Sequence, residues 1–501
     1  MIKKFIDKLI DKARGGPRSG AARGKRVEVP KSEHGIDPAL VDERAAKVVR
    51  TLVEGGYEAY IVGGAVRDLL LGLRPKDFDV ATNATPEQVK ALFRRAFIIG
   101  RRFRIVHVVF GRGRQEHGLS EVIEVSTFRA TMAAVATDQV TGNEKTSKSE
   151  LAGKGHVVDA EGRVLRDNVW GPQIEDAARR DFTVNAMYYD PLREIVVDYH
   201  GGIQDARKKL LRMIGDPSAR YREDPVRIIR AVRFAAKLGF QIEAKTRAPI
   251  QSMAALLDNI PPSRTFDEMI KLLQTGHALK SVEELRKHGM HRGVFPVLDV
   301  VLDEAKRHDG QEKFVRMALA DTDRRVAEGK PVAPSFMLAC MLWHDVRDRW
   351  QKLQDQGEPA FVALQQAIDA VFDAKIGDIS GRGRLAADMR EIWMMQPRFE
   401  RRTGNAVYTL VEQPRFRSGF DFLRLRGEAG EVDAALAAWW EKFSMADAAE
   451  RGQLVERSRT APAPRAALQD SVEAAAEPAR KRRRRRRRAG TGGEVETPTD
   501  A

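Results

Sequence analysis

The sequence predicts an α+β protein: an N-terminal head with a small mixed sheet and helices, all-helical neck and body domains after it, and a disordered basic tail. Three observations predict this class. Between residues 59 and 199, short apolar runs of strand length alternate with helical segments. From about residue 204 to 451, apolar residues recur at helical spacing. After about residue 458, large apolar residues become rare, and Ala, Pro, Arg and Glu dominate.

Length and composition narrow the function classes. The chain has 501 residues, 43% of them apolar, which is enough for two or more packed cores. Cys340 is the single cysteine, so no internal disulfide or cysteine zinc cage can form, and a reducing compartment such as the cytoplasm is expected. No apolar run approaches the ~18 residues of a membrane-spanning helix. The net charge of +15 favours a polyanionic partner, either nucleic acid or an anionic membrane surface.

Changes in composition divide the chain into five segments. In an N-terminal extension (1–38), residues 2–10 place apolar side chains at helical spacing among lysines, and a Gly/Pro/Arg-rich linker follows. The first part is either an amphipathic helix that makes a peripheral membrane or partner contact, or a small cap on the core. The remaining segments are a head (39–203), a neck (204–290), a body (291–456) and an Arg-rich tail (457–501).

Turn and capping signals separate the elements of the head. Gly55-Gly56 and Gly72 end two helices. Thr85-Pro86-Glu87-Gln88 has the N-cap, first-turn proline and third-position glutamine of a helix start. Residues 130–160 lack a sustained period and are expected to form a mobile surface loop. The expected helices are 41–54, 65–71, 174–187 and, in the neck, 225–238; the expected strands are 59–62, 78–81, 105–110, 122–128 and 195–199.

Two aspartates in the second strand are the first candidate site. Residues i and i+2 of a strand point to the same face, so Asp77 and Asp79 should present two carboxylates side by side. Such like charges repel unless a cation neutralises them, and Mg²⁺ completes its shell with substrate phosphate and water. An isolated Asp-x-Asp pair is more often a solvated turn, so the metal interpretation needs a second signal.

Gly63-Gly64 supplies that signal, because it lies between an apolar strand and a helix start. Without Cβ atoms the backbone can approach a phosphate closely, and the first amides of the helix favour an anion. Arg67, one turn into the helix, could reach the same phosphates. A phosphate cradle one short helix before a carboxylate pair predicts two-metal phosphoryl or nucleotidyl transfer, with Mg²⁺ or Mn²⁺.

Glu124 is the candidate third carboxylate. It lies in an otherwise apolar strand, where an acid is costly to bury unless it is paired or ligates a metal. The alternative is an edge residue that faces solvent.

Four ordered motifs resemble the superfamily that joins bacterial poly(A) polymerases to class II CCA-adding tRNA nucleotidyltransferases. The resemblance covers roughly residues 40–290 and rests on Gly63-Gly64-Ala65-Val66-Arg67-Asp68, Lys76-Asp77-Phe78-Asp79-Val80, Arg179-Arg180-Asp181-Phe182-Thr183-Val184-Asn185-Ala186 and Arg222-Glu223-Asp224-Pro225-Val226-Arg227. It implies a catalytic head, a nucleotide-selecting neck and an RNA-binding body.

The resemblance also implies roles for single residues. Asp77 and Asp79 would be catalytic, and Asp181 would contact the nucleotide and be needed for activity. Asp224 and Arg227 would offer hydrogen bonds to the base edge of ATP. Arg180 and Arg230 are further nucleotide-binding candidates. From the pattern itself, Arg227, Arg230 and Arg233 recur on one helical face, and Asp224 could cap that helix and orient Arg227.

Three features favour the polymerase branch, which adds AMP to RNA 3′ ends, over a CCA-adding enzyme. The segment Gly100-Arg101-Arg102-Phe103 is more basic than is typical of CCA-adding enzymes. Leu165-Arg166-Asp167-Asn168 and the residues around Tyr221 resemble the polymerase version. The run Arg480–Arg488, including Lys481, Arg482, Arg483, Arg484 and Arg485, is typical of that branch and suits sequence-independent phosphate contacts. Arg101, Arg102 and this run are therefore the RNA-binding candidates.

The resemblance suggests a role in mRNA processing and turnover, with RNA-decay or RNA-chaperone proteins as partners, and a monomer. A different class is a non-enzymatic RNA-binding protein with a degenerate transferase fold, against which the intact Gly63-Gly64, Asp77, Asp79 and Glu124 argue. His344-Asp345 invites a metal-phosphohydrolase interpretation, but the other ligands are missing, and His344 is expected to be a helical residue near the core.

Overall fold

A computed structural model shows the fold. It describes residues 24–100, 103–111, 122–130, 138–139, 156–158, 164–167, 169–290, 295–298, 311–375 and 382–460. The amphipathic segment expected near the N-terminus and the arginine run of the tail lie outside these residues. No described helix is long and apolar enough to cross a membrane.

An eight-stranded mixed sheet forms the head, as expected. Its strand order is β1-β11-β10-β2-β3-β6-β5-β4, and every neighbouring pair is antiparallel except β3 and β6. The strands are β1 (Val27–Pro30), β2 (Ala59–Val62), β3 (Asp79–Thr82), β4 (Ala96–Ile99), β5 (Ile105–Val109), β6 (Val122–Thr127), β10 (Met187–Asp190) and β11 (Ile195–Asp198).

Helices cover the sheet, and two apolar cores lie on its faces. One core joins helix residues such as Val48 and Leu52 to Ile61 and Val80, and the other gathers the aromatic rings of Tyr60, Phe128, Tyr188 and Tyr199. The helices of the head are α2 (Lys31–His34), α3 (Glu43–Glu54), α4 (Gly64–Leu70), α5 (Pro86–Leu92), α6 (Gln173–Arg179) and α7 (Gly202–Arg207), with 3-10 turns η1 (Pro38–Leu40) and η3 (Thr183–Asn185).

Local signals in the sequence explain several of these boundaries. Asp42 accepts hydrogen bonds from the first amides of α3, so this helix begins two residues later than expected. Thr85 and Gln88 form the expected reciprocal capping box at the start of α5. The strands expected at 59–62, 105–110, 122–128 and 195–199 are confirmed to within a residue.

Three expectations for the head are wrong. Residues 27–34, expected in the extension, form β1 and α2, and β1 pairs with β11. The helix expected over 174–187 ends at Arg179, and Met187–Asp190 is a central strand. The region 130–160 is not wholly irregular, because β7 (Asp138–Gln139) and β8 (His156–Val158) pair with each other and β8 pairs with β9 (Val164–Asp167).

After residue 204 the described chain is almost entirely helical, as expected. The exceptions are the strands β12 (Leu210–Leu211) and β13 (Gln241–Ile242), which form a two-stranded parallel ladder. The helices and turns are α8 (Pro217–Glu223), α9 (Val226–Leu238), α10 (Ala244–Arg247), α11 (Ile250–Met253), η4 (Ala254–Asn259), α12 (Pro262–Leu273), α13 (Ala278–Lys287), η5 (Pro296–Leu298), α15 (Gln311–Ala327), α16 (Pro334–Asp355), α17 (Ala360–Lys375), α18 (Arg382–Phe399), α19 (Ala406–Val411), α20 (Phe416–Ala429), α21 (Ala434–Met445) and α22 (Ala448–Thr460).

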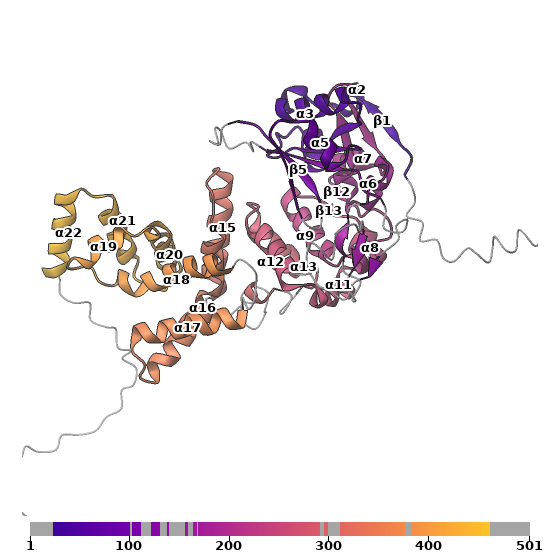
Figure 1. Cartoon of the computed structure of the whole chain (residues 1–501). Helices are drawn as coiled ribbons and strands as arrows, with labels where there is room; N and C mark the ends of the chain where they lie inside the picture. Colours follow the sequence, from indigo (N-terminus) through magenta and orange to yellow (C-terminus); the bar gives the residue numbers. More distant parts are fainter. Residues whose placement is uncertain are drawn as a thin grey trace, which may run out of the picture.

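The elements follow one another in space roughly as in sequence, from the head at one end to α22 at the other (Figure 1). One apolar core runs from Phe182 and Ile229 into α15, α16 and α18, and a second joins the end of α18 to α19–α22. His344 of α16 is 2% exposed, with Nε2 hydrogen-bonded to Glu431, which confirms its place in the core.

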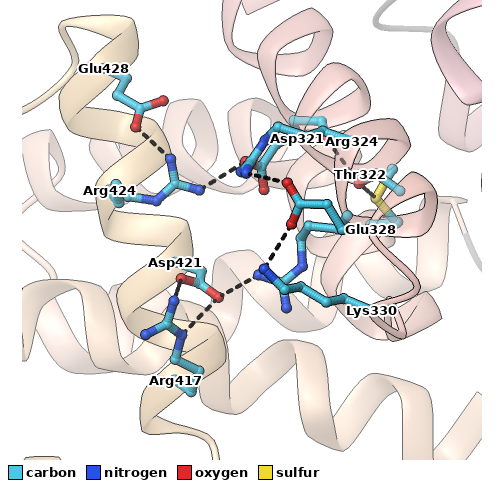
Figure 2. A network of polar contacts seen from close by, with 12 residues as sticks. Asp321, Thr322, Arg324, Glu328, Lys330, Arg417, Asp421, Arg424 and Glu428 are labelled. Carbon is cyan, nitrogen blue, oxygen red and sulfur yellow. Dashed lines mark hydrogen bonds and ion pairs between the residues drawn. The ribbon is translucent and has the colours of Figure 1, made fainter. Parts of the chain in front are cut away.

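Ion pairs tie α15 to α20 beside that core. The carboxylate of Asp321 lies 3.1 Å from Arg424 Nη2, and Asp421 Oδ2 lies 3.3 Å from Arg325 Nη1. Arg417 also pairs with Asp421, at 3.0 Å (Figure 2). Because both aspartates are more than nine-tenths buried in their side chains, these contacts fix how the two helices pack.

Candidate active site

A cleft of about 1060 Å³ opens between the head and the neck. Residues from α4, β3, α6, α9 and α12 line it. The sequence-predicted site residues among these are Gly63, Gly64, Arg67, Asp77, Asp79, Arg180, Asp181, Asp224, Arg227 and Arg230. One cleft therefore brings together predicted site residues that are up to 167 positions apart in the sequence.

The two aspartates line the cleft, although only one lies in a strand. β3 begins at Asp79, so Asp77 lies in the segment before it, and strand alternation does not place the pair. Asp79 is exposed to the cleft, yet desolvation and the negative charges of Glu124 and Asp77 raise its pKa to about 6, against the opposing charge of Arg180. The charge of Arg180 therefore offsets only part of the burial and of the repulsion among these carboxylates.

Glu124 is the register partner of Asp79 on β6, but its side chain is 51% exposed. Its Oε1 lies 3.1 Å from His107 Nε2 on β5. Among the described residues, no three acidic, histidine or cysteine side chains form a group that could hold an ion. The role of Glu124 as the third metal ligand therefore stays a prediction, and in this structure its carboxylate contacts His107.

The oxygen donors still suit a hard divalent cation. Mg²⁺ is usually bound through one or two carboxylates, with substrate phosphates and water completing its octahedron. Asp77 and Asp79 offer such a pair, and the raised pKa of Asp79 marks a place where a cation would relieve repulsion.

Gly63 is where the cleft requires glycine. Its φ of 76° and ψ of −131° lie in a region that side chains with a Cβ rarely adopt. An added Cβ would also lie 3.5 Å from Arg180 Nη1. At Gly64 the nearest atom to an added Cβ would be Arg67 Nη2, at 3.4 Å. Both glycines thus leave space beside a guanidinium, as a phosphate cradle requires.

Contacts with neighbouring side chains fix two arginines of that cradle. Arg67 is buried and donates to Asn185 Oδ1 at 2.7 Å and to Asp68 Oδ1 at 2.7 Å. Arg180 lies 3.1 Å from the buried Asp176 and over the Tyr188 ring. Burial opposes the charge of Arg180, but Tyr188 and Asp176 raise its pKa above the ordinary value. These contacts therefore fix both guanidiniums beside the cleft.

Asp181 lies in the cleft wall with both oxygens engaged. Oδ1 accepts from the Phe182 amide at 2.8 Å, and Oδ2 accepts from Arg230 Nε at 2.8 Å. Burial would raise its pKa, but the charge of Arg230 and these hydrogen bonds hold it below the ordinary value. These contacts make Asp181 a positioning residue for Arg230, and its direct catalytic role stays a prediction.

The expected pairing of Asp224 with Arg227 is wrong. Asp224 makes no side-chain cap to α9, because both of its oxygens lie 3.1 Å from Arg264 Nη2 on α12. Arg227 instead donates to Glu223 Oε2 at 2.8 Å. The two side chains still line one wall of the cleft, each held by a different partner.

Arg220 is a site residue that sequence reasoning missed. Its Nη2 donates to the carbonyls of Arg179 and Arg180 at 2.7 Å each, and its Nη1 donates to Glu223. It therefore joins the nucleotide motif of the head to the selecting motif of the neck. No pattern marks it, because it lies just before the motif in a run of charged residues.

The RNA-binding candidates cannot be placed. Arg101, Arg102 and Lys481 to Arg485 lie outside the described residues.

Comparisons with known proteins cover most of the chain. Three family models match: the poly A polymerase head domain over residues 59–212, the probable RNA and SrmB-binding site of polymerase A over 239–302, and the arginine-rich C-terminus of polymerase A over 356–489. Poly(A) polymerase I of Salmonella typhi is 38% identical over 467 residues, which are 93% of this chain and 96% of that protein.

CCA-adding enzymes match a smaller part. That of Lactobacillus helveticus is 34% identical over 229 residues, which are 46% of this chain and 49% of the enzyme. A solved CCA-adding enzyme in complex with ATP has the same fold, with a TM-score of 0.51, 18% identity and coverage of 87% of this chain and 96% of that one. The match to poly(A) polymerase I continues through the neck, body and Arg-rich region, and the chain therefore belongs to the poly(A) polymerase family of polynucleotide adenylyltransferases.

Proposed function

We propose that this chain adds AMP from ATP to RNA 3′ ends without a template, releases pyrophosphate, and uses two divalent cations bound at Asp77 and Asp79. One observation carries this proposal. A single cleft holds a glycine turn and two fixed arginines beside a carboxylate pair, and the neck residues Asp224 and Arg227 lie on its other side.

The head residues would bind and orient the triphosphate. Gly63 lets the backbone approach the phosphates, and Arg67 and Arg180 supply charge from positions that Asn185 and Asp176 hold fixed. The 3′ oxygen of the primer then attacks the α-phosphorus, the bond to pyrophosphate breaks, and the hydroxyl proton is released. When bound, the cations would lower the pKa of that hydroxyl and stabilise the departing pyrophosphate.

The neck residues would select the base. Asp224 can accept a hydrogen bond and Arg227 can donate one, and a site built to pair with one base edge rejects bases that leave its groups unpaired. Arg264 and Glu223 hold these two side chains in place. A CCA-adding enzyme is the second candidate, because the head and neck resemble both branches. The match of the C-terminal 356–489 to polymerase A favours the polymerase.

We further propose a role in cytoplasmic mRNA processing and turnover, in which many different RNAs must be accepted. The net charge of +15 and the arginine run suit a substrate that is recognised through its phosphates.

Arg227→Ala tests the selecting role. We expect the ratio of kcat/KM for ATP to that for CTP to fall at least tenfold, since one lost base-edge hydrogen bond removes roughly this discrimination. RNA affinity should change little. Steady-state kinetics with each nucleotide at a saturating primer concentration gives the ratio. An unchanged ratio would remove Arg227 from base selection.

A further inference from the structure

A second, smaller cavity of about 370 Å³ lies outside the active-site cleft. The end of α9 with its C-cap Gly239, the strand β13, Arg247 of α10 and one face of α13 line it. On α13, Lys280, Glu284 and Lys287 follow one another at helical spacing and face this cavity. Three cations and one carboxylate thus surround a space that is large enough for a phosphodiester group.

The single carboxylate is already engaged. Glu284 accepts from Lys287 Nζ at 3.1 Å and lies 3.3 Å from Nε2 of the buried His288. Burial lowers the pKa of His288 against the opposing charge and hydrogen bond of Glu284, and Lys287 and Arg247 add to the effect of burial. Within the described part of the chain, Arg247 and Lys280 form no ion pair. The cavity therefore has a surplus of positive charge.

Cations also connect this cavity to the active-site cleft. Lys280 Nζ lies at the end of α9, where a Cβ on Gly239 would be 3.7 Å from it. Two residues earlier on α9, Lys237 lines the cleft together with Lys76. Burial lowers the pKa of His277, the residue before α13, and Lys280, Lys237 and Lys76 lower it further against the opposing charge of Asp323. The three ammonium groups and this one carboxylate therefore lie in one neighbourhood.

A helix C-terminus attracts cations, which could account for one lysine at the end of α9. It does not account for Lys76, which follows α4 in the head, or for Arg247 across the cavity. Unpaired like charges that are gathered along a path repel one another unless a polyanion neutralises them. The path begins at the cleft where a primer 3′ end must lie.

We propose that the primer strand leaves the active-site cleft past Lys76 and Lys237, crosses Lys280, and places a backbone phosphate in the second cavity beside Arg247. This inference rests on the proposed RNA substrate and assigns its route. The cavity lining offers charge and no exposed aromatic ring for base stacking, so the contact reads the phosphate backbone and ignores the base sequence.

The test measures binding of fluorescein-labelled, unstructured RNA primers of graded length to the full chain. The variants are Arg247→Ala, Lys280→Ala and the double variant. Lys245→Ala is the matched control, because Lys245 is exposed on α10 beside Arg247 and does not line the cavity. Fluorescence anisotropy across a salt series gives both the affinity and its salt slope.

We expect the double variant to bind long primers roughly threefold to tenfold more weakly than the control, with a salt slope shallower by ~0.7 for each lost phosphate contact. The loss should begin only above a threshold primer length, since short primers end before the cavity. Equal affinity and slope for the double variant and the control at every length would overturn the route.

A labelled polyglutamate peptide tests an acidic protein as the occupant. If the double variant loses affinity for this peptide but keeps its affinity for long RNA, the cavity serves an acidic polypeptide and the RNA route is wrong. Extension of primers by the unaltered protein is scored in parallel. If the unaltered protein extends no RNA with ATP, the proposed function itself fails, which distinguishes that outcome from a failure of the route.

Discussion

The carboxylate of Asp79 lies where ionisation is unfavourable unless a cation is close. Desolvation and the charges of Glu124 and Asp77 raise its pKa from 3.8 to about 6. A residue whose folded pKa is raised contributes stability below its unfolded pKa and loses that contribution as pH rises through the folded value. Above pH 6, the metal-free protein should therefore be less stable than the same protein with an uncharged side chain at position 79.

Asp79→Asn should make the metal-free protein more stable at pH 8 while it abolishes AMP incorporation. The pKa shift corresponds to ~3 kcal/mol, and solvent in the open cleft reduces this to ~1 kcal/mol. Urea unfolding in EDTA at pH 8 measures the gain. The same titration near pH 4 is the control, because most of the gain is lost at a pH close to the unfolded pKa of 3.8. A variant that is no more stable at pH 8, or that still extends RNA, contradicts this account of Asp79.

Single residues show where sequence reasoning succeeds and fails at the site. Gly63 and Arg67 were predictable, because a strand, a glycine pair and a helix start are local signals. The partners of Asp224 and Arg227 were not predictable. Arg264 lies 40 positions from Asp224 in the sequence, and Glu223 is about as near to Arg227 as Asp224 is. Long-range pairing of charged side chains leaves no periodic pattern in a single sequence.

At the level of elements, helices and strands with clear caps or alternation were predictable. The strands β5 and β6 alternate between buried and more exposed residues, as a sheet with one covered face requires. The strand β10 was missed because all four of its residues are buried, so it has no alternation to distinguish it from a helix. The equally buried β2 was predictable because glycine pairs lie on both sides of it. Between the end of α6 and β10, Asp181 accepts hydrogen bonds from the adjacent Phe182 amide and from the distant Arg230.

The joint between α6 and α8 depends on Arg220, and we expect Arg220→Ala to lower kcat/KM for ATP by roughly tenfold to a hundredfold. The substitution releases the Arg179–Arg180 backbone and removes one of the two arginines that hold Glu223. The triphosphate site and the base site are then no longer fixed relative to each other. Arg222→Ala on the same helix is the control, since Arg222 is exposed.

Thermal unfolding of both variants separates this effect from a general loss of stability. The same loss of kcat/KM in Arg222→Ala, or none in Arg220→Ala, would show that the joint does not position the nucleotide.

At the level of the whole molecule, the order of head, neck and helical body followed from composition and periodicity. The packing of the body did not, because the ion pairs between α15 and α20 join residues about 100 positions apart (Figure 2). The segment boundaries at 203, 290 and 456 stay predictions, since one continuous apolar core runs from the neck into the body helices.

Deleting residues 480–501 should weaken RNA binding without affecting single-nucleotide addition. The run Arg480–Arg488 has only positive charge, so its contribution is electrostatic and independent of RNA sequence. The log–log salt slope should become shallower by ~0.7 for each lost phosphate contact, and the tails made in each encounter should shorten. Binding and extension of several unrelated primers across a salt series measure both effects. Unchanged slopes and tail lengths would show that the run has no part in RNA binding.

The central claim is that the cleft adds AMP alone, with the aid of divalent cations at Asp77 and Asp79. Its most direct test incubates one unstructured RNA primer with each of the four nucleoside triphosphates separately, with and without EDTA, and resolves the products by length. We predict a long ladder with ATP, little extension with the other three, none in EDTA, and none for Asp79→Asn. Extension by CTP that stops after two additions, or an ATP ladder that survives EDTA or Asp79→Asn, would contradict the account.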